Sequence, residues 1–391
     1  MTVILDLADP STFDDPRLPE FWAWSRKEDP VHWQPPRDGR PGFWAVTRHR
    51  DVVTLVRDTD RFRSDRGNVL DVLLAGEDPA GGRMLPVTDG AGHAAMRRLL
   101  NRQFTLRALA GFQAKVEHQA RCLVDAAREA GACDFVSAVA DALPVRTIAD
   151  LMAVPRADHA ALLDIARLAL VTAGQGSLDH EDIRTARGDI VRYFLGLAAE
   201  RRGGDGEDPV TLLTRAHSVE DVALNCYSLL LGGNETTRLT IAGIGQALAE
   251  HPEQWQALRS GEVGLDTAAE EMLRWTTAAM HIGRTTAHDT VVCGRQVLAG
   301  DIVTLWLTSA NRDPSVFNEP DRLDLARDPN PHVVFAGGPH YCLGAELGRI
   351  EVRAVLGALR DLVTRIEPAG RADRVRSTFV RGCASVPVRL S

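Results

Sequence analysis

One long helical segment, residues 218–251, constrains the fold of this chain more strongly than any other part of the sequence. Ser218 is a favourable N-cap residue with Asp221 three positions later, and Pro252 bounds the far end of the segment. At 1.5 Å per residue, a helix of this length would span roughly 50 Å. Residues 222–231 are apolar on nearly every side, so we expect the helix to run through the core.

The middle of this segment suits a buried helix poorly, because it reads Gly232-Gly233-Asn234-Glu235-Thr236-Thr237. Each glycine destabilises a helix interior by roughly 1 kcal/mol relative to alanine, and Glu235 would bring a charge into the core. The glycines would let a ligand lie against the backbone, a threonine hydroxyl can bond to helix carbonyls, and the neighbouring acid could deliver protons. The patch therefore indicates either a ligand groove with a proton donor or a helix kink at a close crossing, and alone it does not decide between them.

The remaining pattern predicts a mainly α-helical protein with small β-sheets (an α+β fold), and we expect one domain over residues 1–391. Strands are expected at residues 43–47 and within 291–307, where Gly294 and Gly300 interrupt an alternating pattern. Residues 311–331 are expected to form a loop. Further helices are expected at residues 17–27, 51–56, 93–102, 108–130, 136–152, 157–171, 183–202, 266–276 and 345–363.

Charge and composition exclude several classes of protein. The net charge of −8 argues against nucleic acid as the main partner, because phosphate binding requires a basic face. The N-terminus does not resemble a signal peptide, and no stretch approaches the roughly 20 apolar residues of a membrane span, so we expect a cytoplasmic protein without a membrane segment. The cysteines have no CxxC spacing and are expected to be reduced; they are Cys122, Cys133, Cys226, Cys293, Cys342 and Cys383.

Cys342 lies in an unusual setting, at the end of a Gly-Gly-Pro turn and at the start of the helix predicted over residues 345–363. The helix dipole and the free backbone N–H groups there favour a thiolate, and Phe335 could shield the sulfur from water. Three interpretations remain open: a buried inert cysteine, a nucleophile with His340 as its base, or a metal ligand that faces an apolar pocket. No second cysteine or histidine nearby has the spacing of a zinc site.

These segments together resemble the cytochrome P-450 superfamily in its soluble bacterial form, over essentially the whole chain. Residues 335–344 resemble the cysteine loop FxxGxHxCxG, and residues 232–237 resemble the oxygen-binding helix with A/G-G-x-D/E-T-T. Residues 309–314 with Phe317 match the family's AANRDP…F segment. The ExxR pair is Glu271 and Arg274, which alone would be an ordinary surface ion pair, and the HxxxR pair is His93 and Arg97.

The resemblance implies the P-450 fold, a triangular helical prism around haem with a long central helix. It implies haem b (iron protoporphyrin IX) as cofactor, with Cys342 as the proximal ligand of the iron. Glu235 and Thr236 would relay protons, and Glu271 and Arg274 would form a structural ion pair completed by Arg322 or Arg327. The residues expected to contact the cofactor are His93, Arg97, Gly233, Arg284, Phe335, His340, Cys342 and Gly344, and the propionates would be held by His93, Arg97, Arg284 and His340.

The implied function is a haem-thiolate monooxygenase that activates O2 and hydroxylates a small organic substrate, most plausibly a natural product. Electrons would come from a separate ferredoxin, with ferredoxin reductase and NAD(P)H, or less plausibly from a flavodoxin. Oxidative C–C or C–N coupling would use the same residues. A haem sensor or carrier without turnover is a further alternative, which the Glu235–Thr236 pair disfavours. Monomer is the family default, and the candidate docking arginines are Arg97, Arg98, Arg102, Arg107 and Arg349.

The resemblance also indicates which segments would surround the substrate. They are residues 66–89, 168–176, 231–233, 278–282 and 379–380, with Thr277 and His281 as polar points. Two positions near the cysteine depart from the family pattern. Ala336 stands where the loop usually has glycine, which could alter the turn, and Gly348 replaces a frequent alanine.

Overall fold

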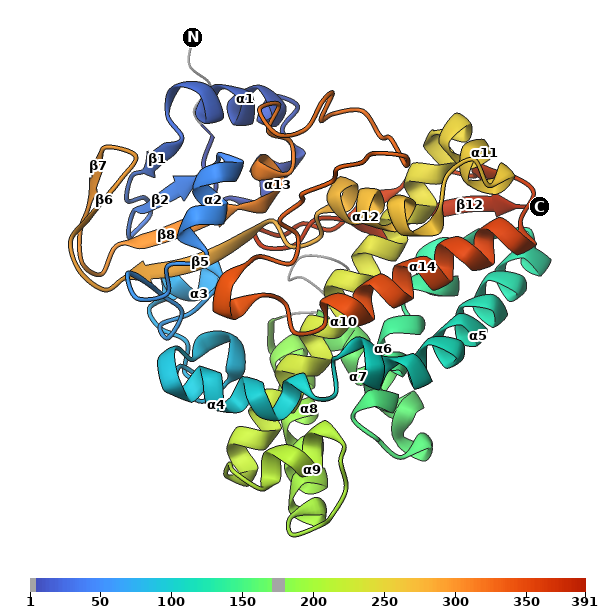
Figure 1. Ribbon diagram of the computed structural model, residues 1–391, viewed down its shortest axis with the longest axis horizontal. Coiled ribbons are helices and arrows are strands. Elements are labelled where there is room, and N and C mark those ends of the chain that lie inside the picture. Colours follow the sequence, from blue (N-terminus) through green and yellow to red (C-terminus); the bar gives the residue numbers. More distant parts are fainter. Residues whose placement is uncertain (1–4, 171–179) are drawn as a thin grey trace.

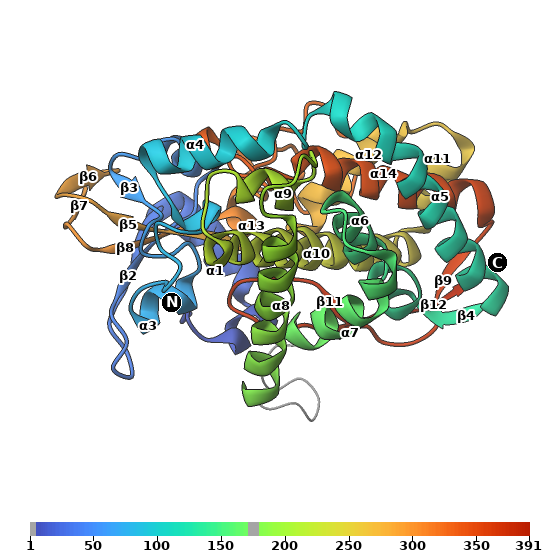
Figure 2. The same ribbon diagram turned by 90° about the horizontal axis from the view of Figure 1, so that it is seen from below.

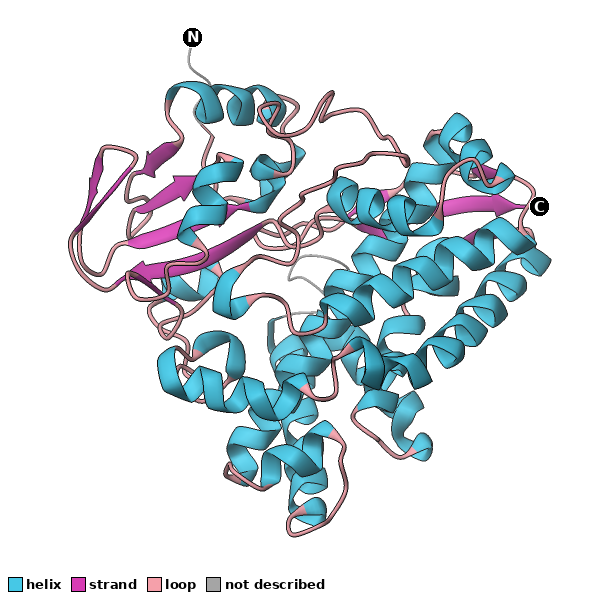
Figure 3. Ribbon diagram, in the orientation of Figure 1, coloured by secondary structure: helices cyan, strands magenta, loops and turns pink. Residues whose placement is uncertain are grey.

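The computed structural model of the protein describes residues 5–170 and 180–391, and helices make up most of this described part (Figure 1). The strands gather mainly at one corner of a roughly triangular outline (Figure 3). In chain order the helices are α1 (Leu18–Glu28), α2 (His49–Leu55), α3 (Leu70–Ala75), α4 (Gly90–Asn101), α5 (Leu106–Ala130), α6 (Leu143–Leu151), α7 (His159–Leu170), α8 (His180–Arg201), α9 (Pro209–Thr214), α10 (Val219–Glu250), α11 (Pro252–Ser260), α12 (Leu265–Thr276), α13 (Leu307–Ala310) and α14 (Ala345–Leu362).

Helix α10 crosses the middle of the molecule, as the sequence predicts (Figure 2). Its N-cap is Ser218, whose Oγ accepts a hydrogen bond from the Asp221 N–H at 3.1 Å. Helices α6, α8, α12 and α14 all pack against it. Its buried side chains, such as Val222, Leu230 and Ile241, belong to the largest hydrophobic cluster of the described residues. The long apolar segment is therefore the central support for the surrounding helices.

The largest sheet has five strands in the order β1-β2-β8-β5-β3. Strand β2 pairs in parallel with β8, and the other neighbours are antiparallel. The strands of this sheet are β1 (Val31–Gln34), β2 (Phe43–Val46), β3 (Phe62–Arg63), β5 (His281–Thr286) and β8 (Ile302–Trp306). The hairpin strands are β6 (Thr290–Val292) and β7 (Arg295–Val297), and the remaining strands are β4 (Ala132–Asp134), β9 (Ile366–Pro368), β10 (Asp373–Arg374), β11 (Cys383–Ser385) and β12 (Pro387–Leu390).

Two sequence predictions differ from the observed elements. The helix expected at residues 136–152 is divided into a π-helical turn, Val136–Ala140, and α6, in which Pro144 occupies an early position that needs no N–H bond. The region predicted as alternating strand divides into β6, β7 and β8, and its breaks at Gly294 and Gly300 fall where the backbone has φ +81° and +87°. No helix of the described residues is both long enough and apolar enough to cross a membrane.

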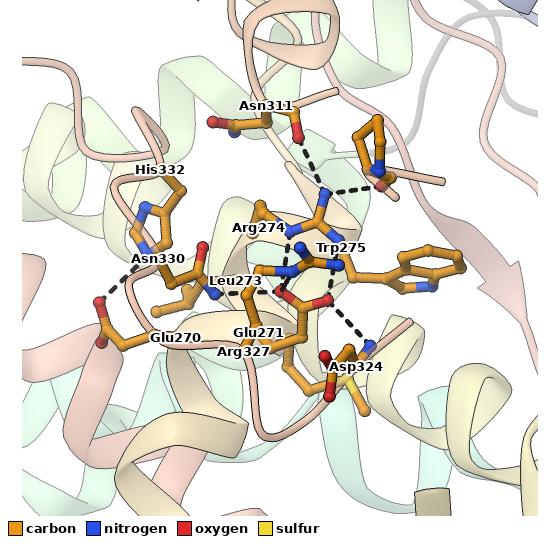
Figure 4. Close-up of polar contacts among 12 residues, drawn as sticks. Glu270, Glu271, Leu273, Arg274, Trp275, Asn311, Asp324, Arg327, Asn330 and His332 are labelled. Carbon is orange, nitrogen blue, oxygen red and sulfur yellow. Dashed lines mark hydrogen bonds and ion pairs between the residues drawn. The ribbon is translucent and has the colours of Figure 1, made fainter. Parts of the chain in front are cut away.

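A buried charge cluster anchors the loop that precedes the cysteine (Figure 4). Glu271 accepts two hydrogen bonds from Arg274, at 2.7 and 2.8 Å, and both side chains have no exposed surface. Arg327 Nε donates to the same carboxylate at 3.1 Å. The predicted structural ion pair is thus a buried triad, and Arg327 is its third member. Arg322 is not its third member, because its side chain pairs with exposed Glu319.

The second set of bonds made by this cluster runs to the backbone of the loop. Arg274 donates to the carbonyls of Asn311 and Pro320, each at 2.9 Å. The side chain of Asn311 accepts the Val333 N–H at 2.8 Å, two residues before Phe335. The loop at residues 311–331 therefore has little regular structure but is held by charged donors, and this fixes the approach to Cys342.

Candidate active site

A cavity of about 310 Å³ lies where α4, α10, β5 and the loop before α14 meet. The loop contributes Cys342, and α10 contributes Thr236 from the opposite side. Every residue predicted to contact the cofactor lines this cavity. The predicted proton donor Glu235 does not. Segments far apart in the sequence thus form one site, as the resemblance implied.

Cys342 is an exposed residue and lines this cavity. Burial raises the pKa of the thiol, while a hydrogen bond from the Gly344 N–H and the charges of Arg97 and Arg349 lower it. The backbone N–H of Cys342 donates to the Phe335 carbonyl at 2.9 Å, which closes the turn. An apolar surrounding with a few opposing positive groups suits a thiolate that becomes charged only on binding a metal cation.

One edge of the cavity carries cationic and N–H groups that lack protein acceptors. His93 Nε2 and Arg284 Nε are buried without a hydrogen-bond partner among the described residues. Burial lowers the pKa of Arg284 to about 10 and is the main cause of the pKa of about 4 at His93. Buried donors of this kind require an acceptor, and carboxylates supply it. The edge therefore fits the two propionates of haem b.

Asp89 is a member of this edge that the sequence analysis missed. Its Oδ1 lies 2.9 Å from His340 Nε2, and its Oδ2 accepts the backbone N–H of Ser64 and of Asp65. Burial opposes ionisation, but these hydrogen bonds and the charge of Arg63 hold the pKa of Asp89 at about 2. The sequence shows that Asp89 lies four residues before His93. It does not show that Asp89 contacts His340, because that residue is distant in the chain. Asp89 orients His340 and balances part of the positive charge.

The opposite wall of the cavity is the irregular middle of α10. Thr236 Oγ1 donates to the Gly232 carbonyl at 3.0 Å, and Thr240 Oγ1 donates to the Thr236 carbonyl at 2.8 Å. A Cβ added at Gly232 would meet no atom within 4 Å, so the backbone is open to the cavity there. Gly233, by contrast, packs against Ile148, 3.4 Å from the position of its missing Cβ. The patch is thus both the ligand groove and the close helix crossing that the sequence left open.

Glu235 points away from the cavity and toward neighbouring helices. Its Oε1 accepts a hydrogen bond from Arg238 at 3.1 Å, and its Oε2 is buried without a partner. Arg238 also lies 3.6 Å from Asp141. Burial raises the pKa of Glu235, while Arg238 lowers it. A carboxyl group that holds a proton more tightly than usual thus lies one residue from the cavity-lining Thr236.

The rest of the wall partly agrees with the predicted substrate segments. Asn68 and Leu85 of the predicted segment 66–89 line the cavity, as do Gly232, His281 and Phe379, one from each of three other predicted segments. Thr277 does not; it caps α12 and bonds to the Arg274 carbonyl and to Asn311. Of the predicted residues 168–176, the part from 171 lies outside the described residues, and Leu168 and Ala169 do not line the cavity. The sequence analysis missed Phe104, Asn225, Ser228, Leu307 and Glu351.

Asn225 has a structural role in this wall. Its Oδ1 accepts the Leu85 N–H at 2.8 Å, and its Nδ2 donates to the carbonyls of Arg83 and Asp221. These bonds fasten the turn Leu85–Val87 to α10. His281 does the same for α3, because its Nε2 accepts the Leu70 N–H at 2.9 Å. Burial lowers the pKa of His281 to about 3, so this ring is neutral and can accept that bond.

Comparisons with known proteins agree with this geometry. The cytochrome P-450 family pattern matches residues 265–360. The chain is 42% identical to the cytochrome P-450 NovI of Streptomyces niveus over 99% of this chain and 96% of that protein. It is 30% identical to linalool 8-monooxygenase of Pseudomonas putida over 98% of each. The solved structure of OxyD, a P-450 of vancomycin-type antibiotic biosynthesis, has a TM-score of 0.91 at 32% identity and covers 99% of this chain and 100% of that one.

The fold and the cavity define a haem-thiolate protein with a core built around one long helix. The chain belongs to the cytochrome P-450 family and is a P-450 monooxygenase. Its cofactor is haem b, for which the cavity provides a thiol at one wall, cationic donors without acceptors at one edge and an open glycine backbone opposite.

Proposed function

We propose that this protein hydroxylates a small, largely apolar natural product, with Cys342 holding the haem iron. The observation that carries the proposal is that Cys342, from the loop before α14, and Thr236, from α10, line one cavity. Bound haem would supply activation of molecular oxygen, which no side chain of this protein can supply. The similarity to OxyD, named for antibiotic biosynthesis, supports a natural-product substrate.

The residues of α10 would manage protons. The Thr236 hydroxyl would take part in hydrogen bonding at the cavity wall. The hydrogen bond that it donates to the Gly232 carbonyl keeps it in place. Glu235 would bring protons from the side of Arg238 and Asp141, where its unpartnered Oε2 retains a proton more readily than an exposed carboxylate. The apolar walls of the cavity would exclude bulk water, so that protons enter through these groups alone.

The electron donor would be a ferredoxin that docks beside α4 and the start of α5. Arg98, Arg102 and Arg107 are exposed there, and no carboxylate pairs with them among the described residues. Leu106, 65% exposed, lies between them and could add an apolar contact. Arg349 does not belong to this surface, because it pairs with Glu270 and Glu346 and covers the Phe335 ring. Arg97 faces the cavity and is likewise excluded.

Two experiments test the proposed function. The reduced carbon-monoxide complex should have the red-shifted Soret band of a thiolate ligand, and Cys342→Ala should lose it; a wild-type protein without that band contradicts the proposal. A library of natural-product intermediates, read by the low-spin to high-spin shift and followed by product analysis, should then give a hydroxylated product. Coupled products that contain no new oxygen atom would instead favour oxidative coupling. A spin-state shift on ligand binding without any turnover would favour a sensor.

The docking surface has its own test. Arg102→Gln and Arg107→Gln should each raise the ferredoxin concentration needed for half-maximal reduction several-fold and weaken its salt dependence. The matched control is Arg259→Gln, an exposed arginine of α11, a helix that lies far from α4 in Figures 1 and 2. Equal effects of all three substitutions would contradict the assignment.

A further inference from the structure

A second cavity, of about 1090 Å³, lies on another side of β5 from the haem site. It is bounded by α1, the C-terminal ends of α10 and α12, and the segment around β10. Arg26, Arg312, Arg381 and Thr308 are among the residues that line it, and we call it the arginine cavity. No step of the monooxygenase function uses any of these residues.

The two cavities share a thin wall, and alternate residues face opposite sides of it. Ala279 and His281 line the haem cavity, whereas Met280 between them lines the arginine cavity. Leu307 likewise lines the haem cavity, and its neighbour Thr308 lines the arginine cavity. This is the alternation expected of extended backbone and of a strand end. The arginine cavity is therefore separate from the haem site and is not an extension of it.

The three arginines of this cavity have little compensating negative charge. Arg312 lies 3.7 Å from Asp321, whose side chain is 82% exposed, and it otherwise donates to the carbonyls of Trp275 and Pro320. Arg26 donates only to Ser309, through the backbone carbonyl and the hydroxyl. The backbone N–H of Arg381 donates to the Ala278 carbonyl, but no hydrogen bond or ion pair of its side chain is found among the described residues. Only Arg312 of the three therefore forms an ion pair with a described carboxylate, and Asp313 and Asp321 raise the pKa of Arg26 from a greater distance.

Burial and mutual repulsion act against these charges. Burial lowers the pKa of Arg312 to about 9, with further lowering by Arg274 and Arg381. The pKa of Arg26 is also lowered, again mainly by burial. The lining also contains Asp14, Asp15, Glu250 and Asp373, but none of these acids forms an ion pair with Arg26, Arg312 or Arg381 among the described residues, and Asp15 pairs with Arg17 instead. Like charges gathered in one cavity are costly unless an anion joins them.

A second observation points to a ligand at the same place. Two polar atoms of the lining are buried without any partner among the described residues: Arg26 Nε and Thr308 Oγ1. Thr308 is only 7% exposed, so solvent does not readily satisfy its hydroxyl. Buried donors without acceptors are uncommon in folded proteins, and an acceptor-rich ligand would satisfy both.

We propose that the arginine cavity binds a small organic phosphate, with the phosphoryl group held by Arg26, Arg312 and Arg381 and by the Thr308 hydroxyl. Only Arg312 of the three guanidinium groups forms an ion pair with a carboxylate among the described residues, and three guanidinium groups match a phosphate dianion better than a single carboxylate. The lining also contains Phe13, Leu18 and Trp22, which would contact an apolar portion of the ligand. The cavity is far larger than inorganic phosphate, and this is the reason for assigning an organic ester.

Calorimetric titration of the haem-loaded protein at constant ionic strength tests this site. Phenyl phosphate should bind saturably with one site per chain and more tightly than inorganic phosphate, and benzoate should bind much more weakly. Arg381→Gln should weaken phenyl phosphate binding about tenfold, because it removes a charge-assisted contact without removing any intramolecular bond. Arg202→Gln, an exposed arginine outside the cavity, is the matched control and should bind as the wild type does.

Thr308→Val keeps the test decisive if arginine variants fold poorly. Valine preserves the shape and removes the unpartnered hydroxyl, so the melting temperature without ligand should not fall, while phenyl phosphate binding should weaken. The proposal is overturned by the absence of saturable binding at millimolar phenyl phosphate, by wild-type affinity in Arg381→Gln, or by benzoate binding as tightly as phenyl phosphate. Tighter binding of inorganic phosphate than of the ester would overturn the organic assignment.

Discussion

Arg327 Nε lies 3.1 Å from Glu271 Oε2, and this contact, with those to Arg274, leaves the buried carboxylate fully paired. Arg327 also donates to the carbonyls of Asn318, Glu319 and Arg322, so one guanidinium joins α12 to the loop before the cysteine. Since removal of one partner leaves a buried charge uncompensated, Arg327→Met should destabilise the protein by about 3 kcal/mol and lower haem retention.

Urea unfolding and the ratio of haem to protein measure this effect. Arg322→Met is a matched control in the same loop, because the Arg322 side chain is exposed and pairs only with exposed Glu319. Its expected effect is below about 0.5 kcal/mol. Comparable losses in the two variants would mean that the loop, and not the buried triad, determines stability here.

Gly348→Ala in α14 should stabilise the protein by about 0.5–1 kcal/mol, because alanine is the better residue in a helix interior. A Cβ at this position would lie 3.9 Å from Phe335 Cε1, an ordinary contact. Gly245→Ala in α10 is the opposing case, since its Cβ would lie 2.4 Å from Phe135 Cδ1. That substitution should destabilise by about 1–3 kcal/mol. Thermal unfolding of both variants checks the pair, and a loss of stability in Gly348→Ala would contradict the reasoning.

Ala336, which departs from the family pattern, has a backbone conformation that suits glycine better. Ala336 has φ +59°, a left-handed conformation that glycine adopts more readily than alanine. Ala336→Gly should therefore raise the free energy of unfolding by up to about 1 kcal/mol. The same exchange at Ala354, inside α14, should lower it by about 1 kcal/mol. Chemical denaturation of the two variants measures both effects. A fall in the free energy of unfolding in both would show that lost packing outweighs relieved strain at Ala336.

Local patterns predicted the parts of the site that depend on spacing within one element. His93 and Arg97 are four residues apart on one helix, and both line the cavity, as does Cys342. Strand β5 escaped prediction because its sequence, with Gly283 and Arg284, has no strand alternation, and its burial comes from neighbours distant in the chain. The sequence also could not decide whether Arg322 or Arg327 completes the ion pair of Glu271 and Arg274, because that too depends on neighbours distant in the chain. The direction of Glu235 likewise depends on Arg238 and Asp141, which only the folded chain brings together.

Glu351 in α14 gives a prediction for pH dependence. It is 2% exposed, its Oε1 has no partner, and burial raises its pKa to about 8. In the unfolded chain this carboxyl group would titrate near 4.3. The folded state therefore binds the proton more tightly, so the contribution of Glu351 to stability is full below about pH 4 and is lost as the pH rises toward 8.

Glu351→Gln replaces the carboxyl group with a neutral amide of similar shape and removes this titration. The free energy of unfolding of the wild type, relative to this variant, should fall between pH 5 and pH 8 by a few kcal/mol, because each pKa unit corresponds to about 1.4 kcal/mol. Denaturant titrations of the haem-loaded proteins at both pH values measure the difference. A difference that stays constant, or that grows with pH, would mean that the folded protein holds Glu351 ionised, with a cation or water beside Oε1.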